Sequence, residues 1–374
     1  MKKTALFLAV LAAVVACKKN NPEEPGIQKV TVADFASEAT KLFVLNEGGM
    51  GTNNASLDVL TFAEGSYKTN VFRNLGDVGN DIAVQGDEVW MVINNSGIVE
   101  VLTASDQEEI AAIQVPTPRN IAFDADYAYV TSWAGAYVTG SYDEQFNYSV
   151  TDYSNPKGQV YRINLKTKEV AGSVEVGYQP EGLAVSGGKL YVANSGGISS
   201  QLPPSYAYDN TVSVIDTKSF TVTQTMEVQV NLKNVYADTK GNIYVTTLGN
   251  YYDVHSGLYW IAPNATVTKV ADYVSTSCIL SDTVYCIGTE EEFNWDPEVT
   301  KVYKAWKATG GQKANWDFTM DATVPYGLFA LNEDTFFVAD AVDYKNPGII
   351  SCFHKGEKIW GVTAGVCPGH FAKW

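Results

Sequence analysis

The sequence predicts an all-β fold, a seven-bladed β-propeller closed by a blade shared between the N- and C-termini. The first observation is a recurring hairpin unit, which reads P-E-G-L-A-V-S-G-G-K-L-Y-V-A-N in its clearest copy at 180–194. The second is that turn residues separate short β-rich runs, with almost no helical periodicity. The third is that the two ends of the repeat region each supply part of one unit. Repeats of about 40 residues with these features are typical of propeller blades.

Drifted copies of the hairpin unit occur elsewhere in the chain. They begin at Gly79, Pro118 and Pro325, with weaker copies near Leu232 and Ser275. After most copies comes a loop of variable length and a second strand pair, clearest in 211–216 and 220–228. Each repeat is therefore expected to form a four-stranded antiparallel sheet.

The two ends of the repeat region complete each other. K-L-F-V-L-N-E-G-G begins at Lys41 and matches the second strand of the unit, whereas P-G-H-F-A-K-W begins at Pro368 and matches only its first strand. One blade split in this way, added to six complete units, gives seven. Because no linker-like break interrupts the repeat, residues 40–374 are expected to form one domain.

The first 16 residues resemble a signal peptide. Two lysines precede an apolar run from Ala5 to Val15, and the segment ends in V-V-A-C at Cys17. This is the pattern of a bacterial lipoprotein signal, in which Cys17 is the lipidated residue; an ordinary secreted protein is the alternative. Residues 17–39, polar and proline-containing at first, are predicted to be a flexible tether. The lipid is then the protein's only attachment to the membrane.

Charge excludes one class of partner. The chain carries 42 acidic and 26 basic residues, a formal net charge of -16. Such a surface repels nucleic-acid phosphates, so nucleic acid is excluded as a ligand.

Four further cysteines lie in a compartment that permits disulfides. Cys278 and Cys286 flank a Ser281-Asp282-Thr283 turn symmetrically, which predicts that they pair across a hairpin and leaves Cys352 and Cys367 as a second pair. Buried free thiols are the alternative.

Catalytic motifs are missing from the sequence. It has no phosphate-binding glycine loop, G-x-S-x-G, C-x-x-C or H-E-x-x-H motif, and only three histidines. These absences favour a protein that is not an enzyme and needs no cofactor or metal.

Loop lengths indicate where a ligand binds. In a four-stranded blade, the connection from the second to the third strand opens on the same face as the start of the innermost strand. The long insertions all fall at that connection: 47–55, 133–157, 195–210, 248–256, 289–300 and 341–347. They are rich in aromatic residues, which offer large contact areas at low entropic cost. Pinning of the loops to the rim is the alternative role for these rings.

Polar residues are expected to line a funnel inside this aromatic rim. They come from the first positions of the inner strands and from the ends of the second strands. The predicted ligand-binding residues are Asn46, Glu47, Asn94, Arg119, Trp133, Tyr137, Glu181, Asn194, Tyr206, Tyr208, Lys233, Asn234, Tyr251, Tyr252, Trp295, Tyr326, Asp340, Tyr344 and His370. A structural role is the alternative for His370. Such a funnel suits a large polar ligand with apolar faces.

A calcium site is the alternative use of the same face. Glu47, Asn120, Asn234 and Asp340 supply the oxygen ligands that Ca²⁺ prefers. This arrangement would suit a calcium-dependent hydrolase of the lactonase kind.

The lipoprotein leader, the repeated P-x-G-[LI]-A-x-x-x-x-x-[LV]-[YW]-V-x-N unit and the closing P-G-H-F-A together resemble the YncE-like seven-bladed propellers. Within that group the chain is most similar to the BtuG-type surface lipoproteins. The resemblance implies a lipid-anchored protein of the outer membrane, exposed at the cell surface. It also implies capture of cobalamin or a related corrinoid, which such proteins deliver to a TonB-dependent transporter of the outer membrane.

Overall fold

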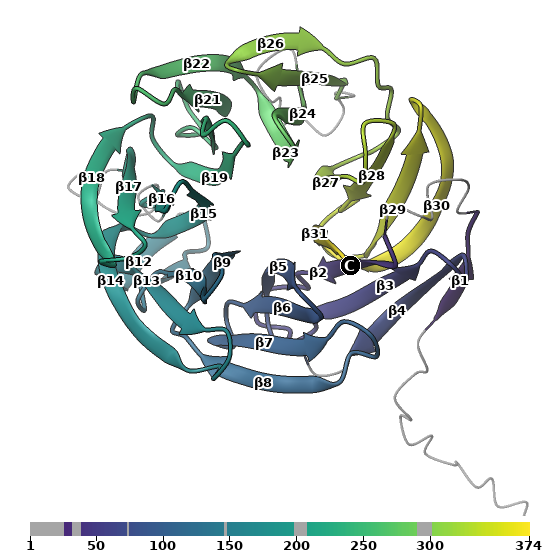
Figure 1. Ribbon diagram of the computed structural model, residues 1–374, viewed down its shortest axis with the longest axis horizontal. Helices are drawn as coiled ribbons and strands as arrows, with labels where there is room; N and C mark the ends of the chain where they lie inside the picture. Colours follow the sequence, from purple (N-terminus) through teal and green to yellow (C-terminus); the bar gives the residue numbers. More distant parts are fainter. Residues whose placement is uncertain (1–25, 32–38, 73–74, 146–147, 198–207, 290–300) are drawn as a thin grey trace, which may run out of the picture.

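The computed structural model shows seven small antiparallel sheets arranged in a ring (Figure 1), which confirms the predicted propeller. It describes residues 26–31, 39–72, 75–145, 148–197, 208–289 and 301–374. Strands and turns make up these ranges, and they hold no helix long and apolar enough to cross a membrane. The predicted signal peptide and Cys17 lie outside the described residues.

Each blade has four strands, which are listed below from the innermost to the outermost. The closing blade is β31 (Pro368–Lys373), β2 (Lys41–Asn46), β3 (Ser56–Thr61) and β4 (Ser66–Phe72). The next three are β5 (Gly79–Gln85), β6 (Glu88–Ile93), β7 (Ile98–Thr103) and β8 (Glu109–Gln114); β9 (Pro118–Phe123), β10 (Tyr127–Ser132), β13 (Lys157–Asn164) and β14 (Val170–Tyr178); and β15 (Pro180–Ser186), β16 (Lys189–Asn194), β17 (Thr211–Asp216) and β18 (Thr221–Glu227).

The remaining three blades complete the circle. They are β19 (Leu232–Ala237), β20 (Ile243–Thr247), β21 (Gly257–Ile261) and β22 (Val267–Asp272); β23 (Val274–Leu280), β24 (Thr283–Thr289), β25 (Tyr303–Thr309) and β26 (Gln312–Asn315); and β27 (Pro325–Ala330), β28 (Thr335–Asp340), β29 (Pro347–His354) and β30 (Glu357–Val366).

The hydrophobic core lies between neighbouring blades. Middle strands such as β6 and β20 are buried on both faces, because a neighbouring blade covers each face, and their sequences are continuous apolar or β-branched runs. Phe43 and Leu45 of the closing blade, for example, pack in one cluster with Met91 and Ile93 of the next. Outer strands such as β18 are mostly exposed and carry polar residues.

Ring closure occurs as predicted. Strand β31 pairs antiparallel with β2, with Val44 opposite Phe371 and Leu45 opposite His370. The carbonyl oxygen of Trp374 accepts hydrogen bonds from the backbone N–H groups of Thr40 and Lys41, 2.6 and 3.0 Å away. The C-terminus therefore supplies the innermost strand of a blade whose other strands come from the start of the domain.

The predicted tether is wrong in one part. Strand β1 (Ile27–Lys29) pairs with β4 and adds a fifth strand to the outer edge of the closing blade. The side chain of Gln28 also bonds the backbone of Thr363 in the adjacent blade, donating at 2.7 Å and accepting at 3.0 Å. This segment is ordered because β4 presents an open edge with unpaired backbone groups.

The predicted disulfides are also wrong, since Cys278, Cys286, Cys352 and Cys367 are all buried free cysteines. In the β23–β24 hairpin, Cys278 lies opposite Tyr285, and Cys286 lies opposite Ser277. The two cysteines are therefore one residue out of register. Their side chains point to opposite faces of the sheet and join different core clusters.

The two faces of the disc differ as expected. The long connections gather on the face where the inner strands begin. On the other face, tight turns such as 187–188 join the strands. Residues 133–157, expected to be a loop, contain a two-stranded hairpin, β11 (Tyr137–Tyr142) and β12 (Tyr148–Ser154). We call the side of the disc with the long connections the elaborated face.

Candidate functional site

A central cavity of about 620 Å³ opens at the start of the inner strands. The innermost strands of the seven blades surround it, and residues near the start of each strand line it. The second residues are Gly369, Asn80, Arg119, Glu181, Lys233, Ser275 and Tyr326, and the third are His370, Asp81, Asn120, Gly182, Asn234, Thr276 and Gly327. All except Gly327 line the cavity, so every blade contributes to one site.

Some inner strands line the cavity to a greater depth than others do. On β19, β23, β27 and β31 the lining extends to apolar or aromatic residues, whereas on β5 and β9 it stops at the third residue. The lining residues beyond the third position of these four strands are Val235, Tyr236, Ser277, Cys278, Ile279, Leu328, Phe329 and Phe371. The cavity therefore has a polar mouth and a more apolar interior.

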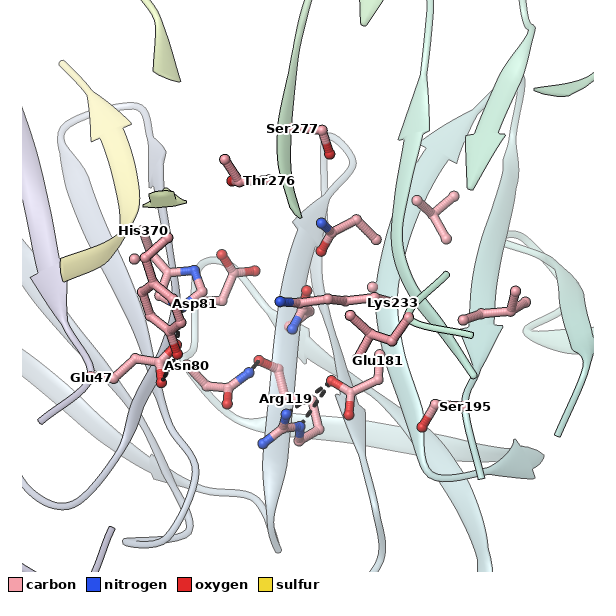
Figure 2. Close-up of a pocket in the computed structure, with 18 of the residues that line it drawn as sticks. Glu47, Asn80, Asp81, Arg119, Glu181, Ser195, Lys233, Thr276, Ser277 and His370 are labelled. Atoms are coloured by element: carbon pink, nitrogen blue, oxygen red, sulfur yellow. Dashed lines mark hydrogen bonds and ion pairs between the residues drawn. The ribbon is translucent and has the colours of Figure 1, made fainter. Parts of the chain in front are cut away.

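Arg119 and Glu181 form an ion pair at the mouth (Figure 2). Nε and Nη2 of Arg119 each lie 3.0 Å from Oε2 of Glu181, and the guanidinium carbon lies 4.4 Å from the ring centroid of Trp133. The side-chain amide of Asn80 donates to the backbone carbonyl of Arg119 at 2.8 Å. The ion pair and the ring contact together hold the Arg119 side chain in one place, and the bond from Asn80 fixes its backbone.

Glu47 is the centre of a second polar cluster. Its Oε1 lies 3.0 Å from Nε2 of His370, and its Oε2 accepts a hydrogen bond from the hydroxyl of Tyr326 at 2.7 Å. Burial by itself raises the pKa of Glu47, but the hydrogen bonds and charges of its neighbours outweigh burial and lower it overall. Burial and the adjacent Glu47 carboxylate raise the pKa of Tyr326 well above its usual value.

Asp81 and Lys233 complete the charged set. The carboxylate of Asp81 accepts hydrogen bonds from the backbone N–H groups of Ile82 and Ile121, both at 2.9 Å. Burial nevertheless raises its pKa. Lys233 extends into the cavity (Figure 2), and within the described residues its ammonium has no hydrogen bond or ion pair.

Gly182 lines the cavity without a side chain. A Cβ atom built at this position would lie 2.5 Å from the carbonyl oxygen of Lys233 in the next blade. Only glycine fits such a close approach of two inner strands. The third position of β15 therefore contributes backbone alone.

The structure places about half of the predicted site residues in this cavity. They are Glu47, Arg119, Trp133, Glu181, Lys233, Asn234, Tyr251, Tyr326 and His370. His370, for which a structural role was the alternative, both lines the cavity and bonds Glu47.

The predicted polar residues at the ends of the second strands do not line the cavity. Oδ1 of Asn46 accepts from the N–H of Gly365 at 3.1 Å, and Asn194 accepts from Gly177 at the same distance. The amide of Asn94 donates to the carbonyl of Pro118 at 2.8 Å. These buried side chains bond backbone and hydroxyl groups within the protein, because a strand end buried between blades must satisfy its polar groups.

Asp340 is a further correction, and it removes the predicted calcium cluster. Its carboxylate accepts from the backbone N–H groups of Thr323 and Val324, both at 2.8 Å, and it does not line the cavity with Glu47, Asn120 and Asn234. Within the described ranges, no group of three or more histidine, cysteine, aspartate or glutamate side chains could hold a metal ion.

Several predicted rim aromatics lie on the long connections of the elaborated face. Tyr251 lines the cavity and is 60% exposed, Tyr252 is 84% exposed, and Tyr137 is 45% exposed at the base of the β11–β12 hairpin. Tyr344, 53% exposed, packs edge-on against Tyr326 with ring centroids 5.7 Å apart. Tyr208 is half-buried and does not line the cavity. Tyr206 and Trp295 lie outside the described residues.

Sequence reasoning missed Asp81 and the deep aromatic lining. Asp81 occupies the same position in its repeat unit as Asn120 and His370, so alignment of the units was the signal for it. Phe329 and Phe371 gave no such signal, because alternation along a strand does not show which core residues border a hollow.

Comparisons with known proteins show the fold and nothing finer. No protein-family model matches the chain, and comparison with curated proteins gives no match. Among solved structures, hydrazine synthase of Kuenenia stuttgartiensis is similar, at 12% identity and a TM-score of 0.59, covering 78% of this chain and 88% of that one. A protein of unknown function from Desulfotomaculum acetoxidans is similar at 11% identity and a TM-score of 0.51, covering 90% and 99%.

Proposed function

We propose that the protein is a non-catalytic capture protein that binds cobalamin or a related corrinoid at the central cavity and the elaborated face. The observation that carries this proposal is that every blade lines one cavity, on the same side as all the long connections. A volume near 620 Å³ falls within the roughly 300–1,000 Å³ of small-molecule sites.

The chemistry of the site suits a corrinoid. A corrin has broad apolar faces and a fringe of neutral amides, so it needs flat hydrophobic contacts surrounded by donors and acceptors. Trp133 and Tyr251 supply such surfaces, while Asn120 and Asn234 present side-chain amides that have no hydrogen-bond partner within the described part of the chain. Cobalamin is larger than the cavity, so part of it would rest on the exposed rim.

Rigidity favours tight binding by the same site. Arg119 is held by Glu181 and Trp133, and Tyr326 by Glu47 and Tyr344. Side chains ordered before binding lose less entropy when the ligand arrives. A closed ring of blades can therefore obtain high affinity from many modest contacts.

Location and partner form part of the proposal. The lipoprotein signal and the resemblance to BtuG-type proteins support attachment to the outer membrane through Cys17, with the propeller exposed at the cell surface. The ligand would pass from there to a TonB-dependent transporter. A calcium-dependent hydrolase is the alternative class, and no arrangement of the described residues favours it.

Calorimetry with cyanocobalamin tests the proposal. The parent protein should bind, Trp133→Ala and Tyr251→Ala should each weaken binding by about 1 to 3 kcal/mol, and Ile359→Ala on the outermost strand should bind like the parent. No binding by the parent at micromolar concentration would overturn the corrinoid assignment. Normal binding by both aromatic variants would move the site away from this cavity.

A further inference from the structure

Among the described residues, every charged side chain that lines the cavity has a bonding partner, with one exception. Glu181 is neutralised by Arg119, and Glu47 is bonded by His370 and Tyr326. Asp81 receives two backbone hydrogen bonds. Lys233, in contrast, has no partner within the described residues.

Lys233 extends from β19 across the cavity mouth (Figure 2), on the far side from Glu47. Its positive charge contributes to the lowered pKa of Glu47, so the two groups interact electrostatically across the cavity. An ammonium that has no protein partner at the mouth of a cavity can bind an anionic group of a ligand that enters from solvent.

Polar groups capable of completing an anion site lie beside it. Asn234 follows Lys233 on the same strand, and Ser275 and Thr276 hold the equivalent positions on the neighbouring blade. An amide and two hydroxyls can donate to oxygens that the ammonium leaves free. On the other side, Gly182 packs closely against the backbone of Lys233 and Asn234 and adds no side chain of its own.

The surrounding charge limits how many negative charges the ligand can carry. Glu47 and Asp81 face the same space, and the whole chain has a net charge of -16. A ligand with several negative charges would be repelled by both, because opposing carboxylates in a confined site raise the cost of each added anion. One free cation therefore matches one singly charged group.

We propose that Lys233 binds the single phosphodiester of cobalamin, so that the ligand enters with its nucleotide loop toward the cavity. This inference rests on the proposed corrinoid function and deepens it. It makes Lys233 the residue that distinguishes cobalamin from cobinamide, a corrinoid that lacks the nucleotide loop and its phosphate.

The test compares two probes, cyanocobalamin and dicyanocobinamide, on three variants by calorimetry. Lys233→Met keeps the length of the side chain and removes its charge, Lys233→Arg keeps the charge, and Lys189→Met removes an exposed lysine from the opposite face. Lys233→Met should lower the affinity for cyanocobalamin about tenfold to a hundredfold, because a charge-assisted hydrogen bond is lost. Its affinity for dicyanocobinamide should stay within about twofold of the parent's.

The other variants define the outcomes. Lys233→Arg should retain most of the cobalamin affinity, and Lys189→Met should bind both probes like the parent. Equal losses for both probes, or no loss for either, in a Lys233→Met protein that melts like the parent would overturn the role of Lys233 and leave the capture function standing. Failure of the parent to bind either probe would overturn the proposed function and this inference together.

Discussion

Nε and Nη2 of Arg119 both lie 3.0 Å from the same carboxylate oxygen of Glu181, across the boundary between two neighbouring blades. The two side chains are only 17% and 13% exposed, so this pair is poorly solvated. It links β9 to β15 at the mouth of the cavity, where the ligand is proposed to bind.

Loss of one partner in this pair should destabilise the protein. Glu181→Ala is expected to lower the free energy of unfolding by on the order of 1 to 3 kcal/mol, because Arg119 keeps a poorly solvated charge without a counter-charge. The exposed pair of Lys157 and Glu175, 3.6 Å apart, offers a control: Glu175→Ala should cost less than about 1 kcal/mol. Urea denaturation measures both, and equal effects would contradict the prediction.

Ring closure should depend on the C-terminal strand. A chain ending at Cys367 lacks β31, which leaves β2 without its inner neighbour and exposes core residues such as Phe43 and Val44 in the closing blade. Loss of a whole strand from a closed ring is expected to lower the melting temperature sharply or to prevent folding. Calorimetric melting is the measurement, with Lys373→Ala as the control. A truncated protein that melts like the parent would show that closure does not require β31.

Glu100 should make stability depend on pH. It is 5% exposed, one of its oxygens has no hydrogen-bond partner among the described residues, and burial followed by the charge of Glu109 raises its pKa to about 7. Because the folded state binds the proton more tightly than the unfolded state, the stabilisation is complete below the ordinary pKa of 4.5 and is lost as pH rises through about 7.

Glu100→Gln tests this dependence, since its amide stays neutral at every pH. At pH 8 the variant should be more stable than the parent by on the order of 1 to 3 kcal/mol, and the gain should shrink toward pH 5. Glu227→Gln, which removes one exposed charge from β18, should show no such dependence. Urea denaturation at the two pH values decides it, and a gain that does not vary with pH would contradict the role of Glu100.

The four propeller cysteines should be free thiols. Cys278, Cys286, Cys352 and Cys367 are all buried, and burial raises the pKa of each thiol, so they should react slowly with a thiol reagent in the folded protein. In denaturant without reductant, a Cys17→Ala protein that reacts with a chromogenic thiol reagent should give the absorbance of four free thiols per chain. A count of two or none would establish disulfides.

Membrane attachment should require Cys17. A Cys17→Ala variant is expected to appear as unlipidated material, unprocessed or soluble, whereas Lys18→Ala should remain lipidated. Labelling with a fatty acid and fractionation of the cells measure both properties. Acylated Cys17→Ala protein in the outer membrane would refute lipidation at this residue.

Local patterns in the chain were sufficient to predict the architecture. The hairpin units, the variable loop after each and the split unit at the two ends depend on residues close together in sequence, and the pairing of β2 with β31 follows from the repeat itself. The same units place Arg119, Glu181, Lys233 and Tyr326 at one position in four of the inner strands, so their meeting in one cavity was also predictable.

Details set by register and by contacts between blades were not predictable. A shift of one residue in the β23–β24 hairpin separates Cys278 from Cys286, and the free edge of β4 recruits β1 from the expected tether. Asn46, Asn194 and Asp340 end their strands where a ligand site was expected, yet their side chains bond nearby backbone groups.

The sequence by itself thus determined the strands, the number of blades and the face that carries the long connections, because alternation and turn residues act over short stretches of chain. Only the tertiary structure decided which charges are neutralised. Glu47 meets His370 across 323 positions of sequence, and Arg119 meets Glu181 across 62, so the state of each charge depends on neighbours that closure of the ring brings together. Lys233 is left without a partner for the same reason, since within the described residues no acidic group of a neighbouring blade lies within bonding distance of its ammonium.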